Sequence, residues 1–308
     1  MAMTPPDAAT SEESSSLVKP PSPTELAPSP PPPLPVSVMT KPLHIVAHTL
    51  PALALVLVGI WMGSVLTSYV KSGDIVTPNK LAGFSWAYAD GHVFNWHPLL
   101  MTFGFVFCSS QAALVYITLP FPHETNKKIH LALHSIAAVS ALVGSIAVFR
   151  FHNEHKITNL YSLHSWLGAL VWFIFVIQWA FGVYAYFYPG ASPTVRASSL
   201  PYHIGGGIGV LALIYATAAT GVLEKLSFNA SCNVSGALNG EEVVGFMASD
   251  CKLGNSIGLV LALSLVAVIV VIIEAKLAPR PSFSSATSET VPLVSNGAAS
   301  KQQGYHHA

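Results

Sequence analysis

Charged residues are scarce in this sequence, and their scarcity excludes most classes of soluble protein. Asp, Glu, Lys and Arg make up 9% of the 308 residues, and 52% are hydrophobic. Soluble domains contain roughly 25% charged residues. The formal net charge is +0, and the sequence has no basic block of the kind that binds nucleic acid. We therefore predict a polytopic membrane protein that resides in a lipid bilayer and has no nucleic-acid partner.

Cysteine is also scarce, and three cysteines are too few for a disulfide framework or a thiolate metal site. Two of them, Cys232 and Cys251, lie in one polar loop. The same loop holds two glycosylation sequons, which begin at Asn229 and Asn233. Paired cysteines and sequons are typical of an oxidising lumen or the cell exterior. Whether the two cysteines bond to each other stays open from the sequence.

Neither end of the chain has the composition needed to bury a core. Residues 1–40 are rich in Pro, Ser and Thr and include the run Pro30–Pro33, which predicts a disordered or polyproline-like tail. Residues 277–308 are rich in Ser and Thr and are predicted to form a flexible tail. The intervening residues 41–276 are predicted to form a single membrane core.

Six apolar segments in this core are long enough to cross a bilayer, which requires about 20 residues of helix. The sequence therefore predicts an all-α membrane protein with six transmembrane helices. Lys and Arg divide equally between the two faces, so the positive-inside rule does not orient the chain. The sequons and cysteines favour cytosolic termini, with an endomembrane, the vacuolar membrane or the plasma membrane as host. The predicted spans are approximately 45–70, 97–119, 129–150, 161–188, 201–223 and 256–276.

Histidine is the abundant polar residue, with thirteen in the chain. Four of them open apolar spans, namely His97, His130, His164 and His203. Because neighbouring spans alternate in direction, His97 and His164 share the membrane face away from the termini, and His130 and His203 share the other. Neutral imidazoles are axial ligands of haem iron, and helix bundles place cofactors between facing side chains. The pattern predicts two bis-histidine haems within the bundle of the four central helices.

Two other classes of protein compete with this interpretation. A single histidine near a helix end could simply lie among lipid headgroups, although four at matching depths favour ligation. A histidine-based proton or metal transporter without haem would line its path with intramembrane carboxylates. Here Glu224 and Glu274 lie only at the ends of spans. A purely structural haem protein would lack small-molecule sites of its own.

Several short strings in the membrane core resemble the signatures of the cytochrome b561 family. They are F-N-W-H-P-L-L-M, N-K-K-I-H, N-L-Y-S-L-H-S-W-L-G, Y-P-G, R-A-S and T-G-V-L-E-K, and the resemblance covers roughly residues 45–276. It implies an ascorbate-dependent transmembrane oxidoreductase with two haem b groups. It also implies that His97, His130, His164 and His203 are the axial ligands. Family members are often dimeric, which makes a homodimer an expectation.

The resemblance further implies a substrate site on each face. On the cytosolic face the matching positions are Lys127, Lys128 and Arg196, beside the haem of His130 and His203. Ascorbate is a monoanion near neutral pH, so cations at this haem edge would hold it.

On the opposite face, the resemblance implies a site for the electron acceptor. His152, Asn159 and Tyr161 match the positions that receive the oxidised substrate, and Arg150 is a further candidate for this site. The expected acceptor is monodehydroascorbate or a ferric chelate.

Overall fold

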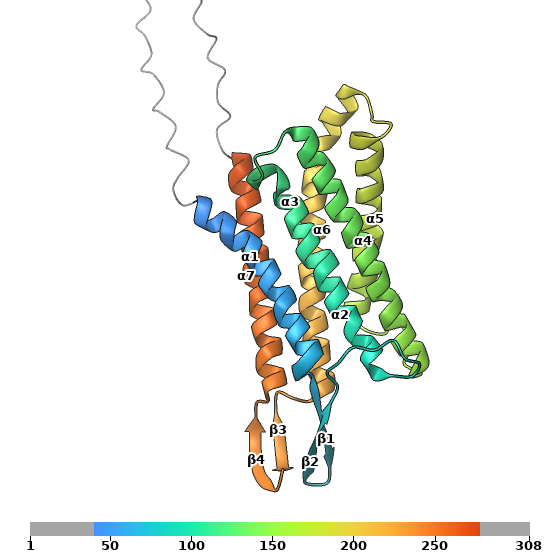
Figure 1. Cartoon of the computed structure of the whole chain (residues 1–308), viewed down its shortest axis with the longest axis vertical. Coiled ribbons are helices and arrows are strands. Elements are labelled where there is room, and N and C mark those ends of the chain that lie inside the picture. Colours follow the sequence, from blue (N-terminus) through green and yellow to red (C-terminus); the bar gives the residue numbers. More distant parts are fainter. Residues whose placement is uncertain (1–39, 278–308) are drawn as a thin grey trace, which may run out of the picture. The chain divides into compact units, whose positions relative to one another are not determined.

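The computed structural model describes residues 40–277, which contain six helical spans long and apolar enough to cross a membrane (Figure 1). The predicted all-α, six-helix class is confirmed. The predicted tails, 1–40 and 277–308, lie outside the described residues except for Thr40 and Leu277, which are the end residues of two helices. The spans are Pro42–Val65, Gly91–Thr118, His123–Glu154, Leu163–Phe187, Pro193–Asn229 and Ser249–Leu277.

Three of the spans change from α-helix to the wider π-helix along their length. The first span is α1 (Thr40–Ile60) followed by π-helical η1 (Trp61–Val65). The second consists of the 3₁₀ turn η2 (Gly91–Asn95), α2 (Trp96–Met101), π-helical η3 (Thr102–Cys108) and α3 (Ser109–Thr118). The others are α4 (His123–Glu154), α5 (Leu163–Gly182) with π-helical η4 (Val183–Phe187), α6 (Pro193–Asn229) and α7 (Ser249–Leu277).

Helix α6 is longer at both ends than the predicted span 201–223. Ser192 accepts a hydrogen bond from the backbone N–H of Val195, and Pro193 occupies the first helical turn, where its missing N–H has no partner to lose. The helix ends where Ala230 adopts a left-handed conformation. Arg196 therefore lies on the first turn of a helix and not in a connector.

Every span packs against at least one other span. α4 packs against the second span, α5 packs against α6, and α7 packs against both α6 and α1. A side chain at Gly104 of η3 would lie 2.7 Å from the carbonyl oxygen of Ala137 in α4, so this glycine allows the two backbones to approach. Indole side chains of α5 donate hydrogen bonds to serines of α4: Trp172 to Ser145 at 3.0 Å and Trp179 to Ser135 at 3.2 Å.

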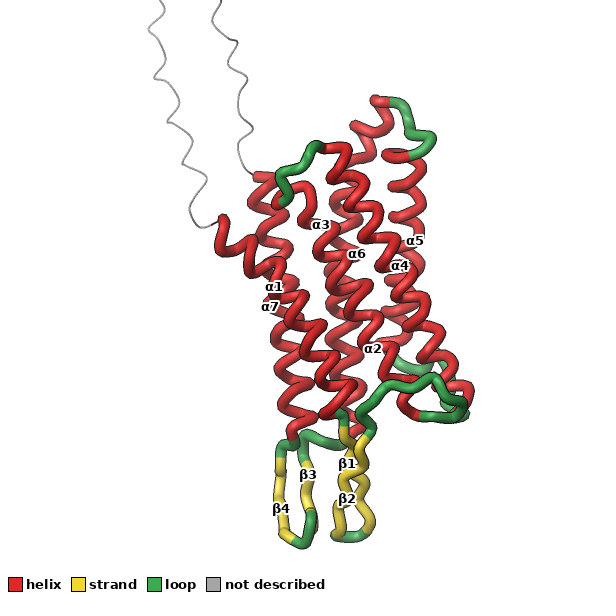
Figure 2. The backbone as a smooth tube through the Cα atoms, viewed as in Figure 1, coloured by secondary structure: helices red, strands yellow, loops and turns green. Residues whose placement is uncertain are grey.

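Two hairpins at one end of the bundle form a sheet that the sequence analysis did not predict. The strands are β1 (Thr67–Ser72), β2 (Ile75–Lys80), β3 (Val234–Leu238) and β4 (Glu241–Phe246). β1 pairs with β2 and β3 with β4, both antiparallel, while a short parallel pairing joins β2 to β3 (Figure 2). The prediction that the first helix continues to residue 70 is wrong, because β1 begins at Thr67, where strand-favouring Thr, Tyr and Val residues occur. We call this end of the bundle the sheet end.

A buried carboxylate fastens the sheet end together. Asp250, at the start of α7, is 1% exposed and accepts hydrogen bonds from the Trp61 indole, the Asn229 amide and the Ser231 hydroxyl. Cys232 and Cys251 form a disulfide beside it. The Asn229 side chain is buried and hydrogen-bonded, so the first sequon is inaccessible to glycosylation in the folded protein. Asn233 of the second sequon is exposed.

Candidate functional site

The structure brings the four span-opening histidines together in two pairs. The rings of His97 (α2) and His164 (α5) lie 6.1 Å apart between centroids, at the sheet end. The rings of His130 (α4) and His203 (α6) lie 6.4 Å apart at the opposite end, where α1 begins and α7 ends. These are the pairs that follow from the alternating direction of the helices.

Three of the four imidazoles are oriented by a backbone carbonyl. Nδ1 of His97 lies 3.1 Å from the oxygen of Gly144, Nδ1 of His164 lies 2.9 Å from that of Thr217, and His130 makes the same contact with Ala112 at 2.8 Å. A carbonyl can only accept, so Nδ1 carries the proton and Nε2 is left with a free lone pair. That is the arrangement of metal-ligating histidines.

The fourth imidazole, His203, lies in a different setting. Its Nδ1 is buried and has no hydrogen-bond partner among residues 40–277. The Tyr186 ring lies 5.1 Å from it, and a side chain at Gly182 would approach its Cε1 to 3.3 Å. Packing therefore holds this ring in place.

The surroundings of both pairs suit a flat, largely apolar cofactor. A side chain at Gly221 would lie 2.7 Å from Cε1 of His164, so this imidazole packs against the bare backbone of α6. The ring centroid of Phe94 lies 6.1 Å from that of His97 in the same pair, and the ring centroid of Tyr116 lies 5.5 Å from that of His130 in the other pair. Within the described chain, no three His, Cys, Asp or Glu side chains gather as a metal site. Paired imidazoles fit the axial positions of haem iron, whose other ligands come from the macrocycle.

The predicted ascorbate-site cations lie at the same end of the bundle as His130 and His203. Lys127 and Lys128 occupy the start of α4, and Arg196 occupies the start of α6. Lys127 forms an ion pair with Glu124 at 2.8 Å, while Lys128 and Arg196 are exposed. The structure places the three on two helix starts without a hydrogen bond between them in residues 40–277.

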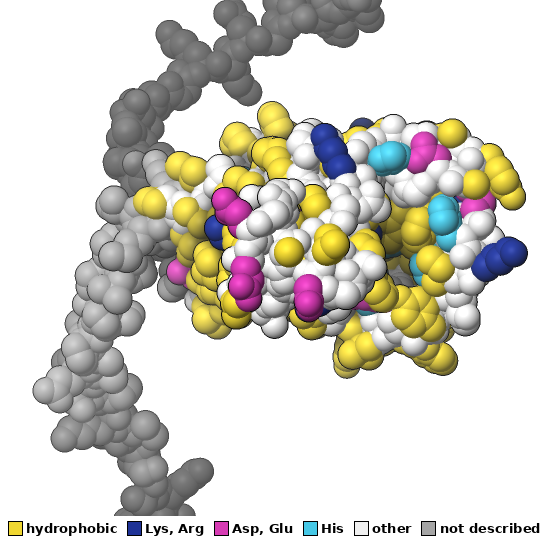
Figure 3. Space-filling view, turned by 90° about the horizontal axis from the view of Figure 1, so that it is seen from below, with side chains coloured by type: hydrophobic (Ala, Val, Ile, Leu, Met, Phe, Trp, Pro, Cys, Tyr) yellow, Lys and Arg dark blue, Asp and Glu magenta, His cyan; other side chains and the backbone are white. Residues whose placement is uncertain are grey.

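The predicted acceptor-site residues at the sheet end are brought together with one exception. The rings of His152 and Tyr161 lie 6.2 Å apart between centroids. Asn159 donates to Asn153 at 2.9 Å, and its own side-chain oxygen is buried without a partner among the described residues. Figure 3, which views the molecule from this end, shows histidine side chains around a hollow.

Glu224, which the sequence analysis treated only as an acid at the end of a span, belongs to this group. Its carboxylate accepts hydrogen bonds from the Tyr161 hydroxyl at 2.9 Å and from the Ser162 hydroxyl at 3.1 Å. Burial and the Glu224 carboxylate together raise the pKa of Tyr161 to about 12. The phenol therefore stays protonated at any physiological pH. The string T-G-V-L-E-K, which contains Glu224, was the available signal.

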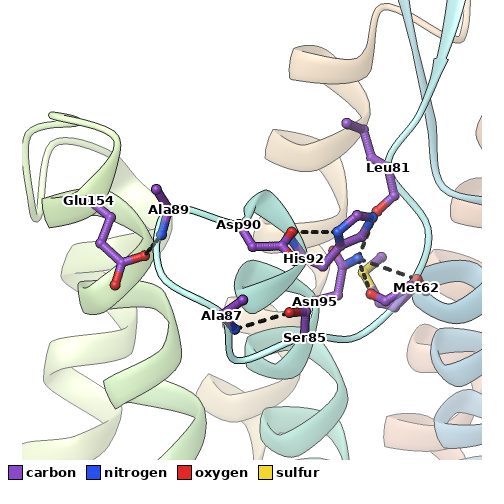
Figure 4. Close-up of polar contacts among 10 residues, drawn as sticks. Met62, Leu81, Ser85, Ala87, Ala89, Asp90, His92, Asn95 and Glu154 are labelled. Carbon is purple, nitrogen blue, oxygen red and sulfur yellow. Dashed lines mark hydrogen bonds and ion pairs between the residues drawn. The ribbon is translucent and has the colours of Figure 1, made fainter.

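Arg150 is the exception, because it is directed to other partners. Its guanidinium forms an ion pair with Glu154, one turn later on α4, and lies 6.0 Å from the Trp86 ring. Glu154 also accepts a hydrogen bond from the backbone N–H of Ala89 at 2.8 Å (Figure 4). Arg150 thus fastens the loop before the second span to α4.

That loop is fixed by further polar contacts just before His97. Asp90 accepts from the backbone N–H of His92 at 3.0 Å, and this bond contributes most to lowering the pKa of Asp90 to about 2. The buried Asn95 amide donates to the carbonyl oxygens of Leu81 and Gly83 at 2.8 and 2.7 Å (Figure 4). These contacts fix the start of the helix that carries His97.

Comparison with known proteins finds relatives of this chain in one family. The family model of eukaryotic cytochrome b561 matches residues 96–229. A probable ascorbate-specific transmembrane electron transporter 2 of Oryza sativa is 41% identical over 236 residues, 76% of this chain and 90% of the relative. A transmembrane ascorbate ferrireductase 2 of Arabidopsis thaliana is 37% identical over 170 residues, 55% of this chain and 70% of the relative. A human lysosomal membrane ascorbate-dependent ferrireductase is 36% identical over 220 residues, covering 70% and 86%.

Proposed function

The chain belongs to the eukaryotic cytochrome b561 family, and we propose that it moves electrons from cytosolic ascorbate to monodehydroascorbate or a ferric chelate across the membrane. It is a multi-pass membrane oxidoreductase. Its relatives are named as ascorbate-specific electron transporters and ascorbate ferrireductases. We further propose that the termini face the cytosol and that the disulfide-bonded sheet end faces the lumen or exterior. A homodimer stays a prediction.

The observation that carries the proposal is the pairing of four imidazoles, three of which have Nδ1 bonded to a backbone carbonyl. We assign His97 with His164 to one haem b and His130 with His203 to a second. When bound, the haems supply the one-electron redox chemistry, and the protein supplies their ligands and an apolar environment. One site near each end of the bundle divides the roughly 30 Å hydrocarbon layer into shorter distances.

At the cytosolic end, Lys128 and Arg196 are free to contact an anion, since both are exposed. Ascorbate is a monoanion near neutral pH and loses one proton with its electron as it becomes the monodehydroascorbate radical anion. The guanidinium of Arg196 offers paired donors to an enolate oxygen. Lys127 is already paired with Glu124, so we assign it a supporting electrostatic role.

At the sheet end, His152, Asn159 and Tyr161 are proposed to hold the acceptor. Reduction of monodehydroascorbate to ascorbate requires one electron and one proton. The Tyr161 hydroxyl donates its hydrogen bond to Glu224, so its oxygen can accept from a substrate hydroxyl. The Asn159 side-chain oxygen, which has no hydrogen-bond partner among residues 40–277, can accept in the same way. Arg150 is engaged by Glu154, and we assign it to the loop before His97.

Charge reversal at Arg196 tests the cytosolic site. We expect Arg196→Glu to slow haem reduction by ascorbate at least about tenfold, since one charge-assisted contact contributes about 1.5–3 kcal/mol. Reduction by dithionite, which needs no specific site, should be unchanged. The matched control is Lys252→Glu, an exposed cation near the sheet end. Equal ascorbate rates in Arg196→Glu and wild type would refute the assignment.

A further inference from the structure

Lys225 is a cation inside the bundle to which the proposed function assigns no role. It lies near the end of α6 and is half-buried, with its ammonium nitrogen 4.3 Å from the centre of the Phe94 ring. Among residues 40–277 its ammonium group makes neither a hydrogen bond nor an ion pair. A cation–π contact compensates only part of the desolvation of such a charge. An anion bound next to Lys225 would complete the compensation.

The neighbouring carboxylates already have other partners. Glu224 accepts hydrogen bonds from Tyr161 and Ser162. Asp250 attracts Lys225 at longer range, but its oxygens are occupied by buried donors from other segments. These donors belong to Trp61, Thr67, Asn229 and Ser231. The missing anion is therefore expected to come from a bound molecule.

The position of Lys225 indicates which molecule this is. Lys225 follows Gly221 by four residues on α6, so the two positions lie one above the other on the same helix face. Gly221 packs against the His164 imidazole, and the Phe94 ring beneath the ammonium lies 6.1 Å from the ring of His97. Lys225 thus lies one helical turn from the His97–His164 pair, toward the sheet end.

We propose that Lys225 binds a propionate carboxylate of the haem held by His97 and His164, and that its charge raises the reduction potential of that haem. Haem b carries two propionates, and in a membrane its charged edge faces the nearer polar surface. A fixed positive charge near the macrocycle favours the reduced state, because reduction adds one negative charge. This inference rests on the proposed function, since it requires a haem at this pair.

Redox titration of the purified protein tests the inference, with haem absorbance as the readout and no acceptor present. In Lys225→Met we expect one of two midpoint components to fall, with about a tenfold lower ratio of reduced to oxidised haem at a given potential. That factor corresponds to about 59 mV for a one-electron couple. Lys225→Arg, which keeps the charge, should titrate close to wild type. The control Lys252→Met removes an exposed cation near the same end and should leave both components in place.

Lys225→Gln serves as a second neutral variant if the methionine variant fails to fold. Unchanged midpoints in a folded, neutral variant would overturn the inference. If the midpoints were unchanged and the KM for ferric citrate rose instead, the Lys225 ammonium would bind the electron acceptor and not a propionate. A wild-type protein without haem would refute the proposed function itself, and this is measured before any variant is compared.

Discussion

Gly221 offers a direct test of how the structure holds His164. A Cβ atom at this position would lie 2.7 Å from Cε1 of the imidazole, whereas carbon atoms in contact lie about 3.5–4.0 Å apart. The ring would have to move by about 0.8 Å or more, yet its Nδ1 is bonded to the carbonyl of Thr217. Overpacking of this kind costs about 1–3 kcal/mol. We expect Gly221→Ala to keep the fold but to lose most of the haem held by His97 and His164.

The assay is haem content per chain, measured with a thermal unfolding curve for each variant. Gly209→Ala on the same helix is the matched control, because nothing lies within 4 Å of its new methyl group. Gly182→Ala should be intermediate, since its methyl group would lie 3.3 Å from Cε1 of His203, whose Nδ1 has no hydrogen-bond partner among residues 40–277. If Gly221→Ala bound as much haem as Gly209→Ala, the reasoning about the packing of His164 would be refuted.

Three further predictions concern the sheet end. Asp250→Asn places an amide donor among buried donors that the carboxylate now accepts from. Because charge-assisted hydrogen bonds contribute about 1.5–3 kcal/mol each, we expect the free energy of unfolding in detergent to fall by about 3 kcal/mol. A fall of less than about 1 kcal/mol would contradict this. Glu224→Gln should lower the pKa of Tyr161 from about 12 toward 10.0, measured as phenolate absorbance against a Tyr161→Phe reference. In the wild type the pKa of this phenol is higher in the folded than in the unfolded protein. Its contribution to stability is therefore present below pH 10 and is lost as the pH rises to about 12. The Cys232–Cys251 disulfide closes a loop with a sequence separation of 19, so its reduction should lower the free energy of unfolding by about 3 kcal/mol. Identical melting curves with and without reductant would disprove that.

The membrane spans and the pairing of the histidines were predictable from the sequence because both depend on local or parity arguments. Apolar length alone marks a helix that crosses a bilayer. Once six spans alternate in direction, His97 and His164 must share one face, and His130 and His203 the other. The structure brings these same rings to 6.1 and 6.4 Å.

The misplaced boundaries have local causes. The fifth span was predicted to begin at residue 201, but the helix begins at Pro193, because Ser192 before it caps the helix and makes proline a favourable first residue. Arg150, which was a candidate for the acceptor site, instead forms an ion pair. Its partner Glu154 is four residues later on the same helix, and this spacing could have predicted the ion pair.

The sheet and the full acceptor site could not be predicted, because both depend on contacts between distant segments. The parallel pairing of β2 with β3 joins the loop after the first span to the loop after the fifth. Glu224 reaches Tyr161 only because α6 packs along α5. The string T-G-V-L-E-K could have marked Glu224 itself, but no single segment specifies which residues it contacts.

We propose that four histidines hold two haem b groups that ascorbate reduces. The most direct measurement is a reduced-minus-oxidised visible spectrum of the purified protein, with ascorbate as reductant and haem quantified per chain. We expect two b-type haems per chain and reduction of much of the signal by ascorbate. A chain that binds no haem would contradict the ligand assignment and favour a histidine-based transporter, and a haem signal indifferent to ascorbate would contradict the donor.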